Sequence, residues 1–194
     1  MKKNCIPLVA LVLSTSLAFA GPFGLSKGMK KEEFPEGLTE LSNQSFFTLT
    51  VPTPSSLIKS YVLTFGKNQG LAKIFCNTPT VRTSVYGEGV ISEFQLVESA
   101  LIKKYGEPKK FDFLHGGSIW TEERYWTMSL QKKERTLAST WSTKSGNKLP
   151  DNLQAIIVKA VAIDAEKIAI TVSYEFDNFA EVAAEIQAKN AEGL

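Results

Sequence analysis

The sequence contains very little cysteine and histidine. Of its 194 residues, two are cysteines and one is a histidine, His115. A zinc site of the usual kind takes about four nitrogen, sulfur or carboxylate ligands, with cysteine and histidine dominating. We therefore predict no metal site and no bound cofactor. A Ser-His-Asp or Cys-His catalytic set would have to use His115, and we identify no catalytic residue.

The chain also lacks an excess of charge of either sign. It has 22 Lys and Arg residues against 20 Asp and Glu residues, and the first twenty residues hold Lys2 and Lys3 but no acid. Beyond that segment the balance is therefore 20 against 20. Nucleic-acid binding depends on clustered excess positive charge. We accordingly expect no nucleic-acid partner.

A long apolar run is missing everywhere after residue 20. Residues 1–20 themselves have a basic start, an apolar stretch from Ile6 to Leu17, and the small-x-small end Ala18-Phe19-Ala20. This pattern is typical of a signal peptide cleaved between Ala20 and Gly21, and the alternative is an uncleaved membrane anchor. Cys5 precedes the apolar stretch, so we do not expect lipidation. We predict a secreted or periplasmic protein with no membrane span after processing.

Residues 21–194 contain a single cysteine, Cys76, so they can form no internal disulfide. This length is sufficient for one domain with a substantial core, and we predict a single α+β domain. Cys76 ends the apolar run from Leu71, which favours a buried thiol that packs as a small hydrophobe. The alternative is a reactive or dimer-forming thiol.

Several segments have clear local patterns. The β-rich runs 61–65 and 71–76 are joined by a short polar turn bounded by Gly66 and Gly70, which predicts a hairpin. Ser92 and Gln95 suit a capping box, and an apolar stripe follows on one helical face, formed by Phe94, Val97, Leu101 and Tyr105. Gly106 and Pro108 then favour the end of that helix.

The second half favours strands and a closing helix. Alternation predicts strands over 126–130, around 137–141 and over 168–176. The run 153–162 is apolar on both faces, which favours a central strand, and Asn178 is placed to cap a helix over 178–190. No βαβα alternation occurs, which argues against a parallel sheet. We therefore predict an antiparallel sheet of about six or seven strands, covered on one face by two main helices at about 92–105 and 178–190.

The segment 111–125 holds the candidate contact residues. His115 lies in a glycine-containing loop, and loops often carry functional groups. Trp120 and Tyr125 are aromatic residues of the kind that dominate interface hot spots, and Glu122 is an acid between them. We predict His115, Trp120, Glu122 and Tyr125 as possible ligand or partner contacts. The competing interpretation is ordinary surface for the polar residues; Trp126 and Trp141 we expect in the core.

Two short motifs carry a resemblance. The segment Gly28-Met29-Lys30-Lys31-Glu32-Glu33-Phe34, and Tyr105-Gly106-Glu107-Pro108 followed by Trp126, resemble small secreted bacterial α+β modules. These modules include the β-lactamase-inhibitor-like proteins and the small outer-membrane assembly lipoproteins. The resemblance implies a similar layered fold in a secreted, non-catalytic protein, with the tryptophan on the strand after the helix. It assigns no specific family and transfers no partner.

The sequence leaves three functional hypotheses. The leading one is a secreted or periplasmic binding protein without catalytic activity, whose ligand is an unknown protein or small molecule of the cell envelope. The second is a cell-envelope hydrolase that uses carboxylates or His115. The third is a periplasmic immunity or inhibitor protein.

Overall fold

The computed structural model describes residues 21–34, 37–42 and 44–192. The proposed signal peptide, including Ala20, lies outside these residues. The described chain is an α+β protein built on one antiparallel sheet, which confirms the predicted fold class. Its strands are ordered β1-β2-β3-β4-β9-β8-β7-β6, and the two-residue β5 pairs with β9. The sheet therefore has nine strands in place of the six or seven expected.

The bounds of the elements follow the chain in a simple order. The strands are β1 (Thr39–Ser42), β2 (Ser45–Thr48), β3 (Ser60–Gly66), β4 (Gly70–Asn77), β5 (Val81–Arg82), β6 (Lys109–Leu114), β7 (Arg135–Ser142), β8 (Leu153–Ala162) and β9 (Lys167–Phe176). The α-helices are α1 (Glu88–Tyr105), α2 (Trp126–Gln131) and α3 (Phe179–Glu192). Four short 3-10 helices complete the set, at Pro22–Gly24 (η1), Lys31–Glu33 (η2), Glu123–Tyr125 (η3) and Thr143–Ser145 (η4).

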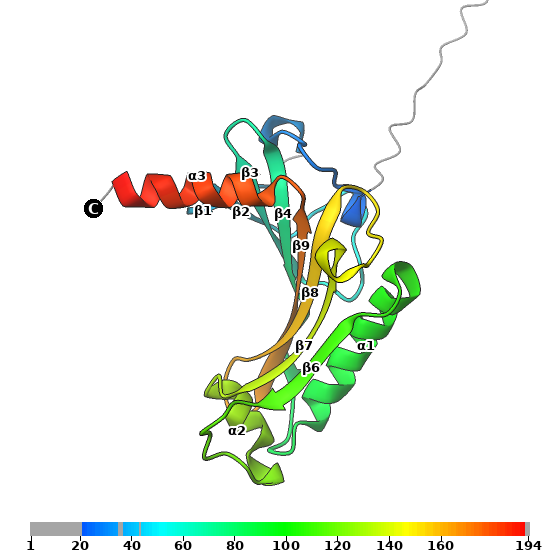
Figure 1. Ribbon diagram of the computed structural model, residues 1–194, viewed down its shortest axis with the longest axis vertical. Coiled ribbons are helices and arrows are strands. Elements are labelled where there is room, and N and C mark those ends of the chain that lie inside the picture. Colours follow the sequence, from blue (N-terminus) through cyan, green and yellow to red (C-terminus); the bar gives the residue numbers. More distant parts are fainter. Residues whose placement is uncertain (1–20, 35–36, 43, 193–194) are drawn as a thin grey trace, which may run out of the picture.

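Helix α1 covers one face of the curved sheet, as Figure 1 shows. The four stripe residues predicted from the sequence are all buried. Each such side chain contributes roughly 1.5–3 kcal/mol when it is removed from water. At the end of the helix, Gly106 has a φ of +78°. Its carbonyl oxygen accepts a hydrogen bond of 2.6 Å from Nε1 of Trp141, which joins the helix end to β7.

The start of α1 differs from the prediction. The helix begins at Glu88, and Ser92 lies exposed inside it. The residue before the helix is Gly87, with a φ of +82°. A Cβ atom there would lie 2.3 Å from the Trp126 ring, so only glycine allows that ring to approach the helix start. This contact comes from a distant segment, which the local capping pattern does not reveal.

Helix α3 meets the sheet from the other side. Tyr174 faces α1, since its ring lies 6.5 Å from that of Tyr105. Its neighbour Glu175 points to the opposite face, because side chains alternate along a strand. Lys73 pairs with Glu175 there and also lies over the ring of Phe179, the first residue of α3. The two main helices therefore do not share one face (Figure 1).

Asn178 does not act as the predicted cap of α3. Its side-chain amide donates hydrogen bonds to the carbonyl oxygens of Gln69, at 3.1 Å, and Leu71, at 3.2 Å. These two carbonyls belong to the turn and second strand of the β3–β4 hairpin. Asn178 consequently fixes the start of α3 to the end of this hairpin.

The segment 126–130, predicted as a strand, is the helix α2. Thr127 donates hydrogen bonds from its backbone nitrogen to the carbonyl of Val85 and from its hydroxyl to the carbonyl of Ser84, at 3.1 and 2.6 Å. Trp126 packs beside Gly87. Alternate apolar residues over five positions fit one turn of helix as well as a strand, and here the tertiary contacts decide.

Trp126 is accordingly half-buried on a helix, while Trp141 is fully buried on β7. The expectation of core placement is thus confirmed for Trp141 and met only in part for Trp126. Cys76 is fully buried as well, and burial raises its thiol pKa well above the ordinary value. In the described part of the chain, no helix is both long and apolar enough to cross a membrane.

Candidate functional site

Three of the four predicted contact residues lie together. The rings of Trp120 and Tyr125 meet edge to face, with centroids 5.4 Å apart. The guanidinium of Arg124 lies 5.1 Å from the Tyr125 ring, and it pairs with the Glu122 carboxylate at 2.8 Å. Trp120 and Tyr125 are half-buried, whereas Glu122 is exposed. We call Trp120, Glu122, Arg124 and Tyr125 the loop cluster.

His115 does not join the loop cluster. Its exposed ring stacks on Phe113 with centroids 5.3 Å apart, and its Nε2 lies 2.9 Å from the Thr136 hydroxyl. Neither neighbour is a carboxylate or a thiol that would form a nucleophile–base pair with it. Among residues 21–34, 37–42 and 44–192, no group of three or more His, Cys, Asp and Glu side chains is arranged to hold a metal ion.

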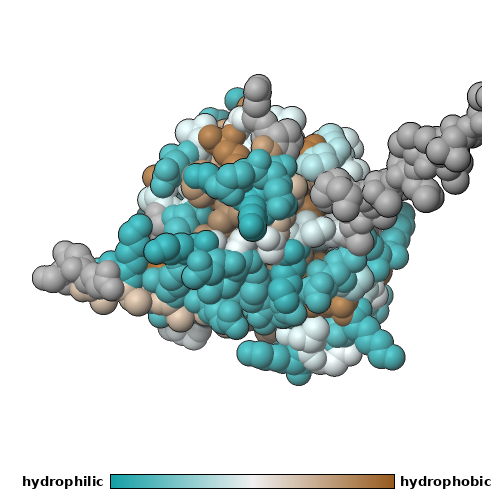
Figure 2. All heavy atoms as spheres, turned by 90° about the horizontal axis from the view of Figure 1, so that it is seen from above, coloured by the Kyte–Doolittle hydropathy of each residue, from teal (hydrophilic) through white to brown (hydrophobic). Residues whose placement is uncertain are grey.

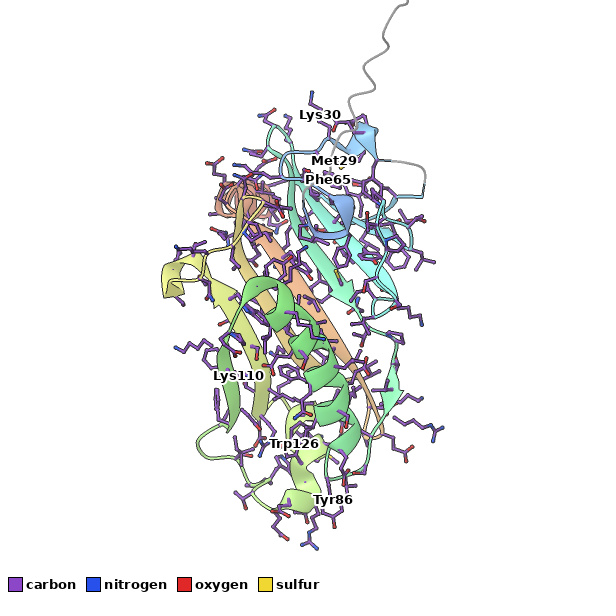
Figure 3. The ribbon with its side chains drawn as sticks, turned by 90° about the vertical axis from the view of Figure 1, so that its right-hand side faces the viewer. Met29, Lys30, Phe65, Tyr86, Lys110 and Trp126 are labelled. Carbon is purple, nitrogen blue, oxygen red and sulfur yellow. The ribbon has the colours of Figure 1, made fainter. Side chains whose placement is uncertain are left out.

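A different part of the molecule contains a cleft of about 810 Å³. It lies at the end of the sheet where the β3–β4 hairpin meets α3, and Figure 3 shows Lys30 and Phe65 at this end, with Trp126 and Tyr86 at the opposite one. We call it the lysine cleft. The lining residues that matter here are Lys30, Lys31, Lys67, Lys189, Phe46 and Phe65.

Two phenylalanines form the apolar floor of the lysine cleft. Phe46 comes from β2 and Phe65 from β3, and their rings meet edge to face at 5.7 Å. Both are more than nine-tenths buried, so only a small part of each ring is accessible. Lys31 extends from η2 over this floor, with its ammonium nitrogen 4.7 Å from the centroid of the Phe46 ring. A cation over an aromatic face is an attractive arrangement.

On the side of the cleft formed by α3, Glu185 links the helix to neighbouring segments. Its carboxylate accepts a hydrogen bond of 2.8 Å from the side-chain amide of Gln44. It also accepts from the backbone nitrogen of Lys67 at 3.4 Å. The other side-chain atom of Gln44, the oxygen Oε1, is buried and has no hydrogen-bond partner among the described residues.

The rim of the lysine cleft carries charges of both signs. Its four lysines face three acids, which are Glu32, Glu40 and Glu185. Within the described ranges, none of these four ammonium groups lies within 4.0 Å of a carboxylate. Viewed from above in Figure 2, this end is largely hydrophilic, with hydrophobic residues visible between the polar ones. The arrangement suits a ligand that combines charge with an apolar part.

A second cavity is much smaller, at about 80 Å³. It lies between α1 and the segment before β3, and its lining is mainly apolar, with Phe23, Val97 and Tyr174 among the residues. Burial raises the pKa of the Tyr174 hydroxyl well above its ordinary value. The volume is far below that of a usual ligand site, so this cavity is better explained as imperfect packing under α1.

Comparison of the chain with protein-family models, curated proteins and solved structures finds no match. The resemblance to small secreted α+β modules therefore remains a prediction. In the structure, Trp126 lies on α2 and not on the strand that this resemblance implied. A different tryptophan, Trp141 on strand β7, contacts the Gly-x-Pro end of the helix, where its ring nitrogen donates to the Gly106 carbonyl.

Proposed function

We propose that this chain is a secreted or periplasmic binding protein without catalytic activity, which holds a small ligand in the lysine cleft. The observation that carries the proposal is the cleft itself, with its apolar floor and with four lysines that form no ion pair with a described residue. Ligand sites in proteins typically have volumes of about 300–1,000 Å³ and a few polar groups on apolar walls. The cell-envelope location rests on the signal-peptide pattern of residues 1–20.

Two alanines on α3 offer a direct test. Ala188 lines the cleft, and Ala184 is also exposed but lies outside the lining. A tryptophan at position 188 is expected to fill part of the cleft, whereas one at 184 leaves it open. The measurement is a titration of the folded protein with a library of small aromatic acids, amines and neutral compounds, followed by amide NMR shifts.

We expect hits that shift the amides of Gly66, Lys67 and Asn68, and that lose binding in Ala188→Trp but keep it in Ala184→Trp. If no compound shifts these amides, the proposal is wrong. It is also wrong if binding is equally strong in the two variants.

The loop cluster supports a second candidate, the immunity or inhibitor protein. Tryptophan, tyrosine and arginine are the residues most enriched at interface hot spots, and here they lie in contact. The test is a photo-crosslinking side chain at position 120, with one at the exposed Lys159 as control. Repeated capture of one envelope enzyme from position 120 alone would favour this candidate, and equal labelling from both positions would remove its support.

The hydrolase hypothesis gains no comparable support. Its one named residue, His115, hydrogen-bonds to Thr136, and the nearby Glu122 carboxylate pairs with Arg124. No hydrogen bond joins His115 to a carboxylate among the described side chains.

A further inference from the structure

We propose that the lysine cleft selects ligands with an anionic group on a compact apolar body, such as an aromatic carboxylate. This inference rests on the proposed function, because it specifies the ligand class of the same cleft. Three features of the cleft support it: the Lys31 ammonium lies over the Phe46 ring, the Glu185 carboxylate already accepts hydrogen bonds, and the apolar surface is small.

Lys31 places a positive charge over the apolar floor. Its ammonium lies 4.7 Å from the Phe46 ring centroid and, among the described residues, lies within 4.0 Å of no carboxylate. An anion that enters the cleft can pair with this ammonium while its apolar part contacts the accessible part of the phenylalanine floor. A cationic ligand would have to approach the same charge and would be repelled.

The acids of the cleft do not cancel its lysines. Four lysines face three glutamates, which leaves one positive charge in excess. One of those glutamates, Glu185, already accepts hydrogen bonds from Gln44 and from the backbone of Lys67. Its carboxylate is therefore less available to a ligand cation than the four ammonium groups, which pair with no described carboxylate, are to a ligand anion. The excess of one positive charge in the cleft is local, because the chain beyond residue 20 has equal numbers of basic and acidic residues.

The apolar part of the ligand must be compact. Phe46 and Phe65 are more than nine-tenths buried and so offer little ring surface, and the remaining apolar surface comes from Ala188 and from the stems of the lysines. A single or fused aromatic ring, or a branched aliphatic group, matches this limited surface. A long acyl chain would extend out of the cleft into water.

Three matched probes separate charge from shape: naphthalene-2-carboxylate, naphthalene-2-carboxamide and 2-naphthylmethylammonium. They share one ring system and differ in charge. The folded protein is titrated with each probe, with amide shifts reporting where binding occurs. The carboxylate is expected to bind about fivefold more tightly than the amide, a ratio that corresponds to one favourable charge contact at an exposed site, and the ammonium to bind weakest.

Lys31→Gln is the decisive variant, and Lys159→Gln is its control. Lys159 is an exposed lysine of β8 outside the cleft. The first substitution is expected to weaken the carboxylate roughly two- to fivefold with little change for the amide, and the second to change neither. Added salt is expected to weaken the carboxylate selectively.

The outcomes keep the two proposals apart. If the amide or the ammonium binds in the cleft as tightly as the carboxylate, the charge selection is refuted while the binding function stands. If Lys31→Gln and Lys159→Gln weaken the carboxylate equally, the attraction is a general surface effect and the inference is wrong. If no probe shifts a cleft amide, both the inference and the proposed function fail.

Discussion

A buried carboxylate attaches helix α1 to the sheet. Glu98 lies on the buried side of the helix and is only 7% exposed, while Ser139 of β7 is fully buried. The Ser139 hydroxyl donates a hydrogen bond to Oε1 of Glu98. The other carboxylate oxygen pairs with the ammonium of Lys110, on β6, at 3.1 Å. The carboxylate thus joins three elements at a place where an apolar stripe would otherwise be expected.

Substitutions of this group should destabilise the fold by different amounts. Ser139→Ala removes a hydrogen bond to a charged acceptor in a buried place, and we expect it to lower the free energy of unfolding by about 1.5–3 kcal/mol. Lys110→Met breaks only the ion pair, whose lysine side chain is 56% exposed. Solvent screening limits that pair to about 0–1 kcal/mol. Glu98→Ala should cost the most, because it leaves the Ser139 hydroxyl without its partner.

Urea unfolding followed by tryptophan fluorescence measures these changes, since Trp141 is fully buried on the same strand as Ser139. A double-mutant cycle of Glu98→Ala and Ser139→Ala isolates the coupling, which should lie at about 1–3 kcal/mol. The reasoning is refuted if the two effects simply add, or if Lys110→Met costs as much as Ser139→Ala.

Three further predictions concern glycine, thiol and phenol groups. Gly87→Ala should lower the free energy of unfolding by at least about 3 kcal/mol, because it combines a positive φ with a clash on the Trp126 ring. Its control is Gly117→Ala, which has a similar φ but open space around it and should lower the same quantity by about 1–2 kcal/mol in the urea assay. Cys76 should resist thiol reagents in the folded protein, as peptide mass spectrometry would detect, and rapid labelling without denaturant would contradict its burial. Tyr174 keeps its proton in the folded state, so its contribution to stability is fully present below the unfolded-state pKa of about 10 and is lost as the pH rises towards the raised folded value. In Tyr174→Phe, the free energy of unfolding should therefore fall less between neutral and strongly alkaline pH than it does in the unsubstituted protein. An unchanged pH profile would contradict this prediction.

The parts of the fold that the sequence predicted well depend on neighbouring residues. The β3–β4 hairpin needs two β-rich runs and a short turn, and all of these lie in one stretch of chain. The buried stripe of α1 and its glycine end are likewise readable from helical spacing. Trp120 and Tyr125 meet because they are close in sequence, although their role as contacts remains a prediction.

The failures share one physical cause, which is contact between distant segments. Trp126 is helical partly because its ring packs at Gly87, and Asn178 serves the hairpin and not its own helix. Strand β6 was not predicted, although Phe111 and Phe113 alternate with Asp112 along it. An exposed edge strand with charged residues has weak apolar patterning, so the sequence pattern does not reveal β6.

The lysine cleft could not have been predicted from the sequence. Its lining includes residues of η2, β1, β2, β3, the β3–β4 turn and α3, which only the tertiary fold brings together. Charged residues such as Lys31 and Lys189 fit ordinary solvated surface equally well when they are considered one at a time. The local aromatic density of 120–126 was the stronger signal in the sequence, and Trp126 of this segment lies at the opposite end of the molecule (Figure 3).

One measurement tests the central claim most directly: the intermolecular nuclear Overhauser effects between bound naphthalene-2-carboxylate and the aromatic rings of the protein. The lysine cleft as a ligand site predicts contacts from the naphthalene protons to the rings of Phe46 and Phe65. Contacts to Trp120 and Tyr125, with none to the two phenylalanines, would contradict it and place binding at the loop cluster.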